Sequence, residues 1–371
     1  MQKWAAGVAL ALGTFVVAAQ AGQVVVGQVA PFSGIDGNQA KAYAAGMQLA
    51  FNNANKAGVN GNTITLVRKD DGGKPEETLR LTQELIDQDK ATVLAGYFGI
   101  ANIETIARSG VLDKNHIALV GWRAAQIRPE TMNLFNVRAS LRDEMFKMSE
   151  HMSTQGITKL GIMYEQGPGG VALMTSAGEA AQKAHVTIAA MAGYPAGTAN
   201  VQQAVQAMIK VQPQAIMMVA SGAAASAFVD QYRKAGGRAA LFANSGVDPE
   251  QLGAKLNDDQ VQGISIAQAV PSPYKMQSKI GKEFADAVAK ADKLEVPVSY
   301  AMMEGYIAGK VVVEAIRRQG KAPTREGTIE ALGRMDYFDM GGYSVAYRPD
   351  IRAGSKFVEL TILGGKGKVR Q

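Results

Sequence analysis

The sequence predicts an α/β protein built from two doubly wound lobes with parallel-type sheets, and three observations support this prediction. Short runs rich in β-branched residues alternate with amphipathic stretches of helical spacing, as in parallel strands joined by crossover helices. The alternation runs through the chain twice, once before and once after Arg138. The chain has 371 residues, and at about 150 residues per domain this length suits two domains or one bilobed body.

The first series of elements covers residues 24–120. Pro31 closes its first strand, Gly58 ends its first helix and Pro75 opens the second helix. The expected strands lie at residues 24–30, 63–68, 92–95 and 117–120, and the expected helices at residues 39–57, 75–87 and 103–112.

The second series follows Arg138 and ends in a helical block that returns to strands. Such a return predicts that the chain crosses between the lobes more than once, so that the connections form a hinge. No Pro-rich or Ser-rich linker is present, which argues against a flexible tether. Strands are expected at residues 160–164, 186–190, 215–219, 240–243, 343–347 and 357–363, and late helices at residues 274–292, 300–318 and 325–335.

Residues 1–21 have the features of a cleaved secretory signal peptide. Lys3 supplies the positive charge, residues 4–17 are almost wholly apolar, and Ala19-Gln20-Ala21 fits the small-x-small cleavage rule. A membrane anchor is the alternative, but Gln20, Gly22 and Gln23 suit a cleavage site better than a bilayer core. We therefore expect a mature protein that begins near Gly22 and lies in the periplasm.

Composition excludes several kinds of function. The 39 Lys and Arg residues exceed the 33 Asp and Glu residues without forming a basic run, so we expect no nucleic-acid partner. The chain has no cysteine, and its three histidines, at 116, 151 and 185, have no paired spacing. No G-x-S-x-G or G-K-[ST] motif occurs. We expect no metal, no cofactor and no catalytic residue.

One glycine-rich motif requires a choice between two interpretations. Residues 167–172 match G-x-G-x-x-A after an apolar strand, which is the pattern of a dinucleotide site. Such a site needs an acidic residue about 20 positions later, and residues 186–193 contain none. An ordinary strand-to-helix turn is therefore favoured over an exported enzyme.

A loop at residues 96–102 is the strongest candidate for a binding site. It follows a buried-type strand and precedes a helix, so the backbone N–H groups that come directly after Gly99, at Ile100, Ala101 and Asn102, would face a ligand carboxylate. Tyr97 and Phe98 would supply apolar or stacking contacts. The alternative is a tight turn in which Asn102 caps the helix.

Two further loops are expected at the same edge of the sheet. Gly121, Trp122 and Arg123 follow the strand at 117–120, where Trp122 offers a stacking face and Arg123 a two-pronged donor for a carboxylate. The alternative is a surface arginine that covers a partly buried tryptophan. Ser33, after the first strand, could donate a hydroxyl hydrogen bond.

These motifs together resemble one family: the periplasmic solute-binding proteins of type I fold, specifically the branched-chain amino acid (Leu/Ile/Val) receptors of ABC importers. The resemblance covers essentially the whole mature chain, and it depends on the order and spacing of short motifs. They are residues 31–34 (PFSG), 70–72 (DDG), 96–102 (GYFGIAN), 135–138 (FNVR), 304–306 (EGY) and 339–342 (DMGG).

The resemblance implies two lobes joined by three crossovers, with a ligand in the cleft and hinge closure around it. By similarity, residues 22–139 plus 271–340 form one lobe and residues 140–270 plus 341–371 form the other. In the family, a Tyr and a Glu of the second lobe hold the ligand ammonium. Here these positions fall near Ser221 and Ser245, and Ser221, Asn244 and Ser245 would close on the ligand. Because burial of an unpaired ammonium is costly, the sequence leaves open whether the ligand carries one.

The function expected from the resemblance is capture of a small carboxylate or amino-acid-like solute for an ABC permease in the inner membrane, by a monomeric protein that is not an enzyme. A ligand sensor that feeds a signalling receptor or regulator is the alternative.

Overall fold

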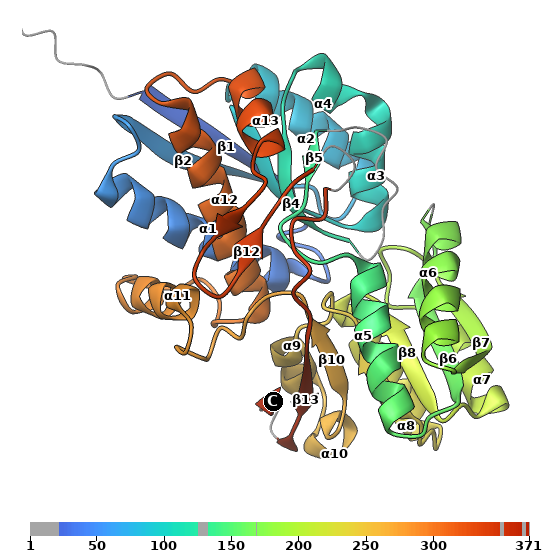
Figure 1. Cartoon of the computed structure of the whole chain (residues 1–371). Helices are drawn as coiled ribbons and strands as arrows, with labels where there is room; N and C mark the ends of the chain where they lie inside the picture. Colours follow the sequence, from blue (N-terminus) through green and yellow to red (C-terminus); the bar gives the residue numbers. More distant parts are fainter. Residues whose placement is uncertain (1–21, 125–132, 168, 349–351, 366–368, 371) are drawn as a thin grey trace, which may run out of the picture.

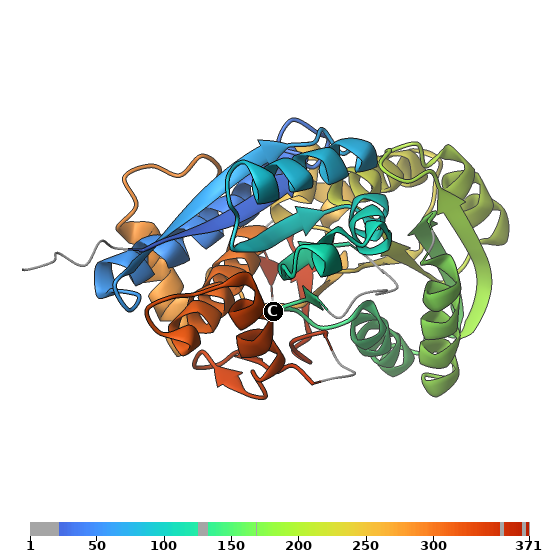
Figure 2. The same cartoon turned by 90° about the horizontal axis from the view of Figure 1, so that it is seen from above.

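The computed structural model describes residues 22–124, 133–167, 169–348, 352–365 and 369–370 and shows two α/β lobes (Figures 1 and 2). The predicted signal peptide at residues 1–21 lies outside the described residues. None of the described helices is long and apolar enough to cross a membrane.

The first lobe contains a five-stranded parallel sheet in the order β2-β1-β3-β4-β5. Helices pack on both faces, each over its own apolar cluster. The strands are β1 (Gly22–Ala30), β2 (Asn62–Asp70), β3 (Val93–Phe98), β4 (Leu119–Arg123) and β5 (Leu134–Phe135). One face carries α1 (Gly37–Ala57), α11 (Lys279–Ala289), α12 (Tyr300–Gln319) and α13 (Arg325–Gly333), and the other carries α2 (Pro75–Asp87), α3 (Ile100–Ser109) and α4 (Val111–Lys114).

Small residues allow α1 and α12 to pack closely in the core of this lobe. A Cβ atom at Gly46 of α1 would collide with the backbone of Met302 and Tyr306, and one at Gly305 of α12 would collide with the backbone of Tyr43. The ring of Tyr43 is thereby held beneath the ends of β3 and β4, where it meets the ring of Phe98 edge-on at 5.7 Å.

The second lobe contains a seven-stranded sheet in the order β14-β13-β10-β9-β8-β6-β7. The strands from β10 to β7 are parallel, whereas β13 and β14 pair antiparallel. They are β6 (Lys159–Glu165), β7 (Thr187–Tyr194), β8 (Ala215–Val219), β9 (Ala240–Ala243), β10 (Ser265–Gln268), β13 (Glu359–Leu363) and β14 (Val369–Arg370). One face carries α5 (Leu141–Thr154) and α6 (Gly170–Lys183), and the other carries α7 (Gln202–Val211), α8 (Gly222–Lys234), α9 (Pro249–Lys255) and α10 (Asp258–Val261).

The chain passes from the first sheet to the second between β5 and α5, returns after β10, and passes again to β13. Before this last passage, the hairpin of β11 (Phe338–Asp339) and β12 (Ser344–Val345) packs in the core of the first lobe together with Tyr347. The lobe limits from the sequence remain a prediction, and this packing favours moving the last change of lobe from Gly341 to beyond Tyr347.

The predicted α/β fold with two lobes is confirmed, and two predicted loops are wrong. Residues 96–98 belong to β3, which runs to Phe98, and residues 121–123 belong to β4, which runs to Arg123. Both strands are longer than predicted because pairing continues: Tyr97 is in register with Trp122, and Phe98 with Arg123.

Candidate functional site

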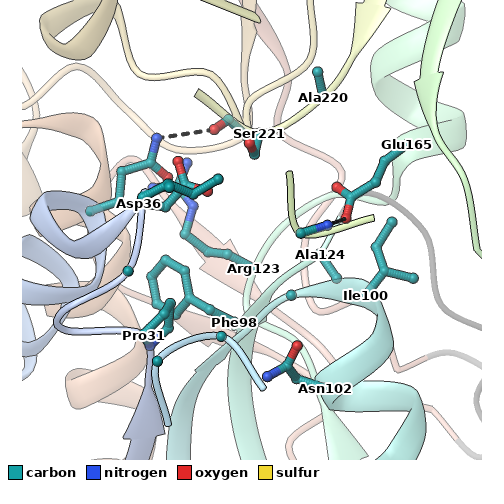
Figure 3. Close-up of a pocket in the computed structure, with 18 of the residues that line it drawn as sticks. Pro31, Asp36, Phe98, Ile100, Asn102, Arg123, Ala124, Glu165, Ala220 and Ser221 are labelled. Carbon is teal, nitrogen blue, oxygen red and sulfur yellow. Dashed lines mark hydrogen bonds between the residues drawn. The ribbon is translucent and has the colours of Figure 1, made fainter. Parts of the chain in front are cut away.

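A cavity of about 290 Å³ lies between the two lobes (Figure 3). Both lobes supply its walls, and the carboxyl ends of parallel strands point toward it, as expected for open α/β sheets. Of the residues that the sequence predicted for the site, eight line the cavity: Ser33, Phe98, Gly99, Ile100, Asn102, Arg123, Ser221 and Asn244. Tyr97, Ala101, Gly121, Trp122 and Ser245 are not among its lining residues.

The start of α3 forms part of the first-lobe wall. Gly99 has a φ of 88° and its N–H donates to the backbone oxygen of Arg123 at 2.9 Å, which turns the chain sharply from β3 into the helix. The next N–H groups, at Ile100 and Ala101, belong to the first helical turn and have no acceptor within the helix. This geometry can receive a carboxylate, and the predicted carboxylate contact stays a prediction.

Asn102 is not the helix cap of the alternative interpretation. It lies inside the first turn of α3, whose N-cap position is Gly99. Its amide nitrogen donates to the hydroxyl of Thr78 at 2.7 Å and to the Asp71 carboxylate at 3.3 Å. The side chain therefore connects α3 to α2, through Thr78, and to the loop before α2, through Asp71.

Tyr97 and Trp122 are core residues, which corrects their predicted contact with the ligand. Successive side chains of a strand point to opposite faces, so the paired residues Tyr97 and Trp122 face α2 and α3. Tyr97 is 0% exposed and shares a 2.9 Å hydrogen bond with the hydroxyl of Thr82, and Trp122 is 6% exposed. Only the next pair, Phe98 and Arg123, reaches the cavity.

Gly121 is a strand residue in close contact with the helices and not a loop residue at the cavity. Its φ is 67°, and a Cβ atom there would collide with the hydroxyl of Tyr43 and approach the Cβ of Ala308 to 3.1 Å. Glycine is therefore required by backbone conformation and by packing.

The side chain of Arg123 extends from the first lobe and contacts residues of the second. Its Nη2 lies 3.1 Å from Asp248 Oδ1 and donates to the backbone oxygen of Ser245 at 2.5 Å, and its Nε lies 3.7 Å from Glu304 Oε2. Burial alone would lower the pKa of Arg123, but Asp248 and Glu304 raise it above its ordinary value. The alternative of a surface arginine is wrong, because Arg123 is only 5% exposed. Its Nη1 has no acceptor among the described residues.

Ser245 is part of a neighbouring ion-pair network and is not among the lining residues of the cavity, which argues against its predicted contact with the ligand. Its N–H and hydroxyl both donate to Glu144 at 2.7 Å. The same carboxylate pairs with Arg138, whose Nη2 lies 2.8 Å away, and Arg138 Nη1 lies 3.6 Å from Glu304 Oε2. Burial raises the pKa of Glu144, and Arg138 and Ser245 oppose this rise.

Ser221, Asn244 and Ser33 line the cavity, but each is engaged in local structure. The hydroxyl of Ser221 is the N-cap of α8 and accepts from the N–H of Ala224 at 3.4 Å. The amide oxygen of Asn244 accepts from the N–H of Ala220 at 3.0 Å. The N–H of Ser33 donates to Asp70 at 3.3 Å.

Glu165 and Asp36 line the cavity and were not predicted as site residues. Glu165 is the last residue of β6, and its carboxylate accepts from the N–H of Gly197 at 3.1 Å and from the hydroxyl of Tyr194 at 3.3 Å. Asp36 precedes α1 and accepts from the N–H of Ala223, in α8 of the other lobe, at 3.2 Å. The signal for Glu165 was its place at the carboxyl end of a parallel strand, the same rule that located Gly99.

The protonation of Glu165 is affected by its burial and by its neighbours. Burial raises the pKa of Glu165, the hydrogen bonds from Gly197 and Tyr194 oppose this, and the charge of Asp36 adds to it. The wall can therefore stabilise a cation. Within the described part of the chain, no group of three or more His, Cys, Asp and Glu residues could hold a metal ion.

Comparison with known proteins identifies the family. The family model described as "Periplasmic binding protein" matches residues 23–363. A solved substrate-binding periplasmic protein from Ralstonia solanacearum is 35% identical, with a TM-score of 0.84 over 93% of this chain and 99% of that one. A Leu/Ile/Val-binding protein homolog from Brucella abortus is 23% identical over 92% of this chain and 88% of its own.

A shorter match is to an "Amino acid binding protein" from Pseudomonas aeruginosa, 34% identical over 98 residues, which is 26% of each chain. The matched family and structures are solute-binding proteins and not enzymes. The family is periplasmic, in agreement with the expected location. The resemblance seen in the motifs is confirmed: the chain belongs to the periplasmic binding protein family and has its type I fold.

Proposed function

We propose that this protein is the solute-binding component of an ABC importer and captures a small amino-acid-like solute between its lobes. The main support for the proposal is a cavity between the two lobes, which also contact each other directly through polar groups. Gln39 of the first lobe donates to Gln251 of the second at 2.7 Å and to the backbone oxygen of Gly246 at 3.2 Å. A solute that touches both walls favours the state in which the lobes are together, by its difference in affinity for the two states.

The cavity offers complementary groups for an amino-acid-like solute. The N–H groups at the start of α3 would hold the carboxylate, with Arg123 Nη1 as a second donor. Glu165 would hold an ammonium group, which supplies the anionic partner that Ser221 and Ser245 cannot. The Leu/Ile/Val-binding and amino acid binding relatives support this class of ligand.

A panel of amino acids, amides and aromatic carboxylates, screened by thermal shift and then by isothermal titration calorimetry, tests the proposal. Ile100→Pro removes one N–H at the first position of α3, where helices tolerate proline. We expect it to weaken binding at least tenfold, whereas Ile100→Val keeps the N–H and should change affinity less than threefold. Absence of binding across the panel, or chemical conversion of a bound compound, would contradict the proposal.

The transport partner is tested separately in cells. Uptake of the radiolabelled solute identified by calorimetry should disappear when the gene for this chain is deleted and return when the gene is restored. Uptake that is unchanged, together with a solute-dependent transcriptional response, would favour the sensor instead.

A further inference from the structure

The buried charges around the cavity do not balance. Arg123 and Arg138 line it, and three buried carboxylates contact them: Asp248 and Glu144 form ion pairs at 3.1 and 2.8 Å, and Glu304 Oε2 lies 3.7 Å from Arg123 Nε and 3.6 Å from Arg138 Nη1. This network alone holds one more carboxylate than guanidinium. The two arginines therefore provide no spare positive charge for other carboxylates of the wall.

Two further carboxylates, Asp36 and Glu165, line the cavity without any Lys or Arg partner among the described residues. Figure 3 shows their side chains on opposite sides of the cavity, Asp36 from the first lobe and Glu165 from the second. Asp36 accepts from the N-terminal turn of α8, and Glu165 accepts from the neutral donors Gly197 and Tyr194. Hydrogen bonds of this kind satisfy lone pairs but add no full positive charge.

An independent observation points to a hydrogen-bond acceptor on the same ligand. Arg123 is 95% buried, since its exposed fraction is 5%, and it lines the cavity. Its Nη1 has no hydrogen-bond acceptor in the described part of the chain, although Nη2 has two. A buried donor without an acceptor costs free energy, so a ligand oxygen at this place would be favoured.

Resting on the proposed function, we propose that the solute is a basic amino acid or a close relative, with one carboxylate and two cationic nitrogen groups. The carboxylate binds at the start of α3 and Arg123 Nη1, the α-ammonium binds Glu165, and the cationic group of the side chain binds Asp36. Burial raises the pKa of Glu165, and the charge of Asp36 adds to that effect, so a cation bound at Glu165 would oppose the rise. A neutral branched-chain amino acid would leave one of them unpaired.

Calorimetry with matched compounds tests this inference without any variant. L-lysine and L-norleucine share the α-amino acid group and the four-carbon side chain, and norleucine lacks only the terminal ammonium. We expect L-lysine, L-ornithine or L-arginine to bind at least tenfold more tightly than L-norleucine. Cadaverine, which is lysine without its carboxylate, should bind more weakly than lysine.

The variant Asp36→Asn keeps the size of the side chain and removes its charge, and its amide oxygen can still accept from the N–H of Ala223. It should weaken binding of the basic amino acid at least tenfold and change binding of norleucine less than threefold, because the α-ammonium that both compounds share binds Glu165. Asp87→Asn is the matched control, because Asp87 lies on α2 of the same lobe and accepts from the side chain of Gln83 at the surface, at 2.9 Å. Its affinities should equal those of the wild type.

The outcomes separate this inference from the proposed function. Leucine or norleucine binding as tightly as lysine would overturn the inference and keep the proposed function. The same result would follow if Asp36→Asn left the ratio of the lysine and norleucine affinities unchanged. Failure of every amino acid, diamine and simple carboxylate to bind would overturn the proposed function itself.

Discussion

Two neighbouring residue pairs at the ends of β3 and β4 have opposite roles. Tyr97 and Trp122 pair in register and face the helices of the first lobe, where they form part of its core. Phe98 and Arg123 are one position further along and face the cavity. All four residue types could contact a ligand, so strand position, and not chemistry, decides which do.

The comparison also shows that a residue lining the cavity can connect the two lobes directly. Phe98 contributes an apolar ring to the wall, whereas Arg123 reaches across the cavity to Asp248 and the backbone of Ser245. Contact between the lobes therefore pairs charges beside the cavity. Substitutions at the cavity-facing and at the core-facing positions of β3 and β4 test which residues contact the solute and which stabilise the fold.

Arg123→Ala tests the cavity-facing pair most severely. It leaves Asp248 and Glu304 buried without this cation, and breaking a buried ion pair by removing one partner costs about 3–5 kcal/mol. We expect the free energy of unfolding in urea to fall by about this amount. Lys234→Ala is the control, because Lys234 is 72% exposed and its pair with Asp230 should contribute less than about 1 kcal/mol. Equal losses in the two variants would refute the structural role of Arg123.

Gly121→Ala adds one methyl group on the same strand, two residues before Arg123. The positive φ and the collision with Tyr43 should together lower the free energy of unfolding by about 2–3 kcal/mol. Gly170→Ala, in the first turn of α6, is the matched control, since a Cβ atom there meets nothing within 4 Å. A thermal melt of both proteins checks the difference, and a Gly121→Ala melting temperature equal to the wild type would contradict it.

Glu250 lies two positions after Asp248, the second-lobe partner of Arg123, and should titrate near neutral pH. Burial, and then the charge of Asp248, raise the pKa of Glu250 to about 7, and its hydrogen bond from Tyr274 opposes this. The folded protein then holds a proton that the unfolded chain has released. Stability is therefore greatest below the ordinary carboxyl pKa of about 4.3 and falls as the pH rises to about 7.

Glu250→Gln should remove this pH dependence. The free energy of unfolding of the variant, minus that of the wild type, should rise by about 1–2 kcal/mol from pH 5 to pH 8. Urea unfolding at each pH measures this difference. Glu150→Gln is the control at an exposed pair with Lys147 on α5. Parallel curves for the wild type and Glu250→Gln would show that Glu250 does not titrate in this range.

Sequence reasoning found much of the fold and eight of the 21 residues that line the cavity. Alternating strands and helices and the carboxyl-end rule located β3, α3 and the Gly99 turn, because these depend on local pattern. The rule could not tell that Tyr97 faces the core and Phe98 the cavity, since that depends on which face of the strand meets which helix. One residue of strand length reverses the assignment.

The second-lobe wall was harder to predict for a different physical reason. The hydroxyls of Ser221 and Ser245 could both bind a ligand. However, Ser221 caps α8, and Ser245 donates to Glu144, which lies 101 positions away in the chain. A single sequence does not specify such a distant contact. Glu165 directly follows the strand predicted at residues 160–164, where the carboxyl-end rule applies, but only the tertiary structure shows that it lines the cavity. Charge pairing across the lobes, as between Arg123 and Asp248, depends on tertiary structure alone.

Tyr97→Phe tests the core-facing pair with the smallest expected effect. The substitution removes only the hydroxyl that meets Thr82 Oγ1 at 2.9 Å, and loss of one buried hydrogen bond should cost about 1 kcal/mol of unfolding free energy. The dissociation constant for the solute should not change, because Tyr97 faces away from the cavity. Phe98→Leu is the counterpart one position later: it should weaken binding more than Tyr97→Phe does, because its ring lines the cavity. Titration calorimetry on both variants measures this contrast, and a weaker affinity for Tyr97→Phe alone would return Tyr97 to the binding site and reverse the assignment of the two pairs.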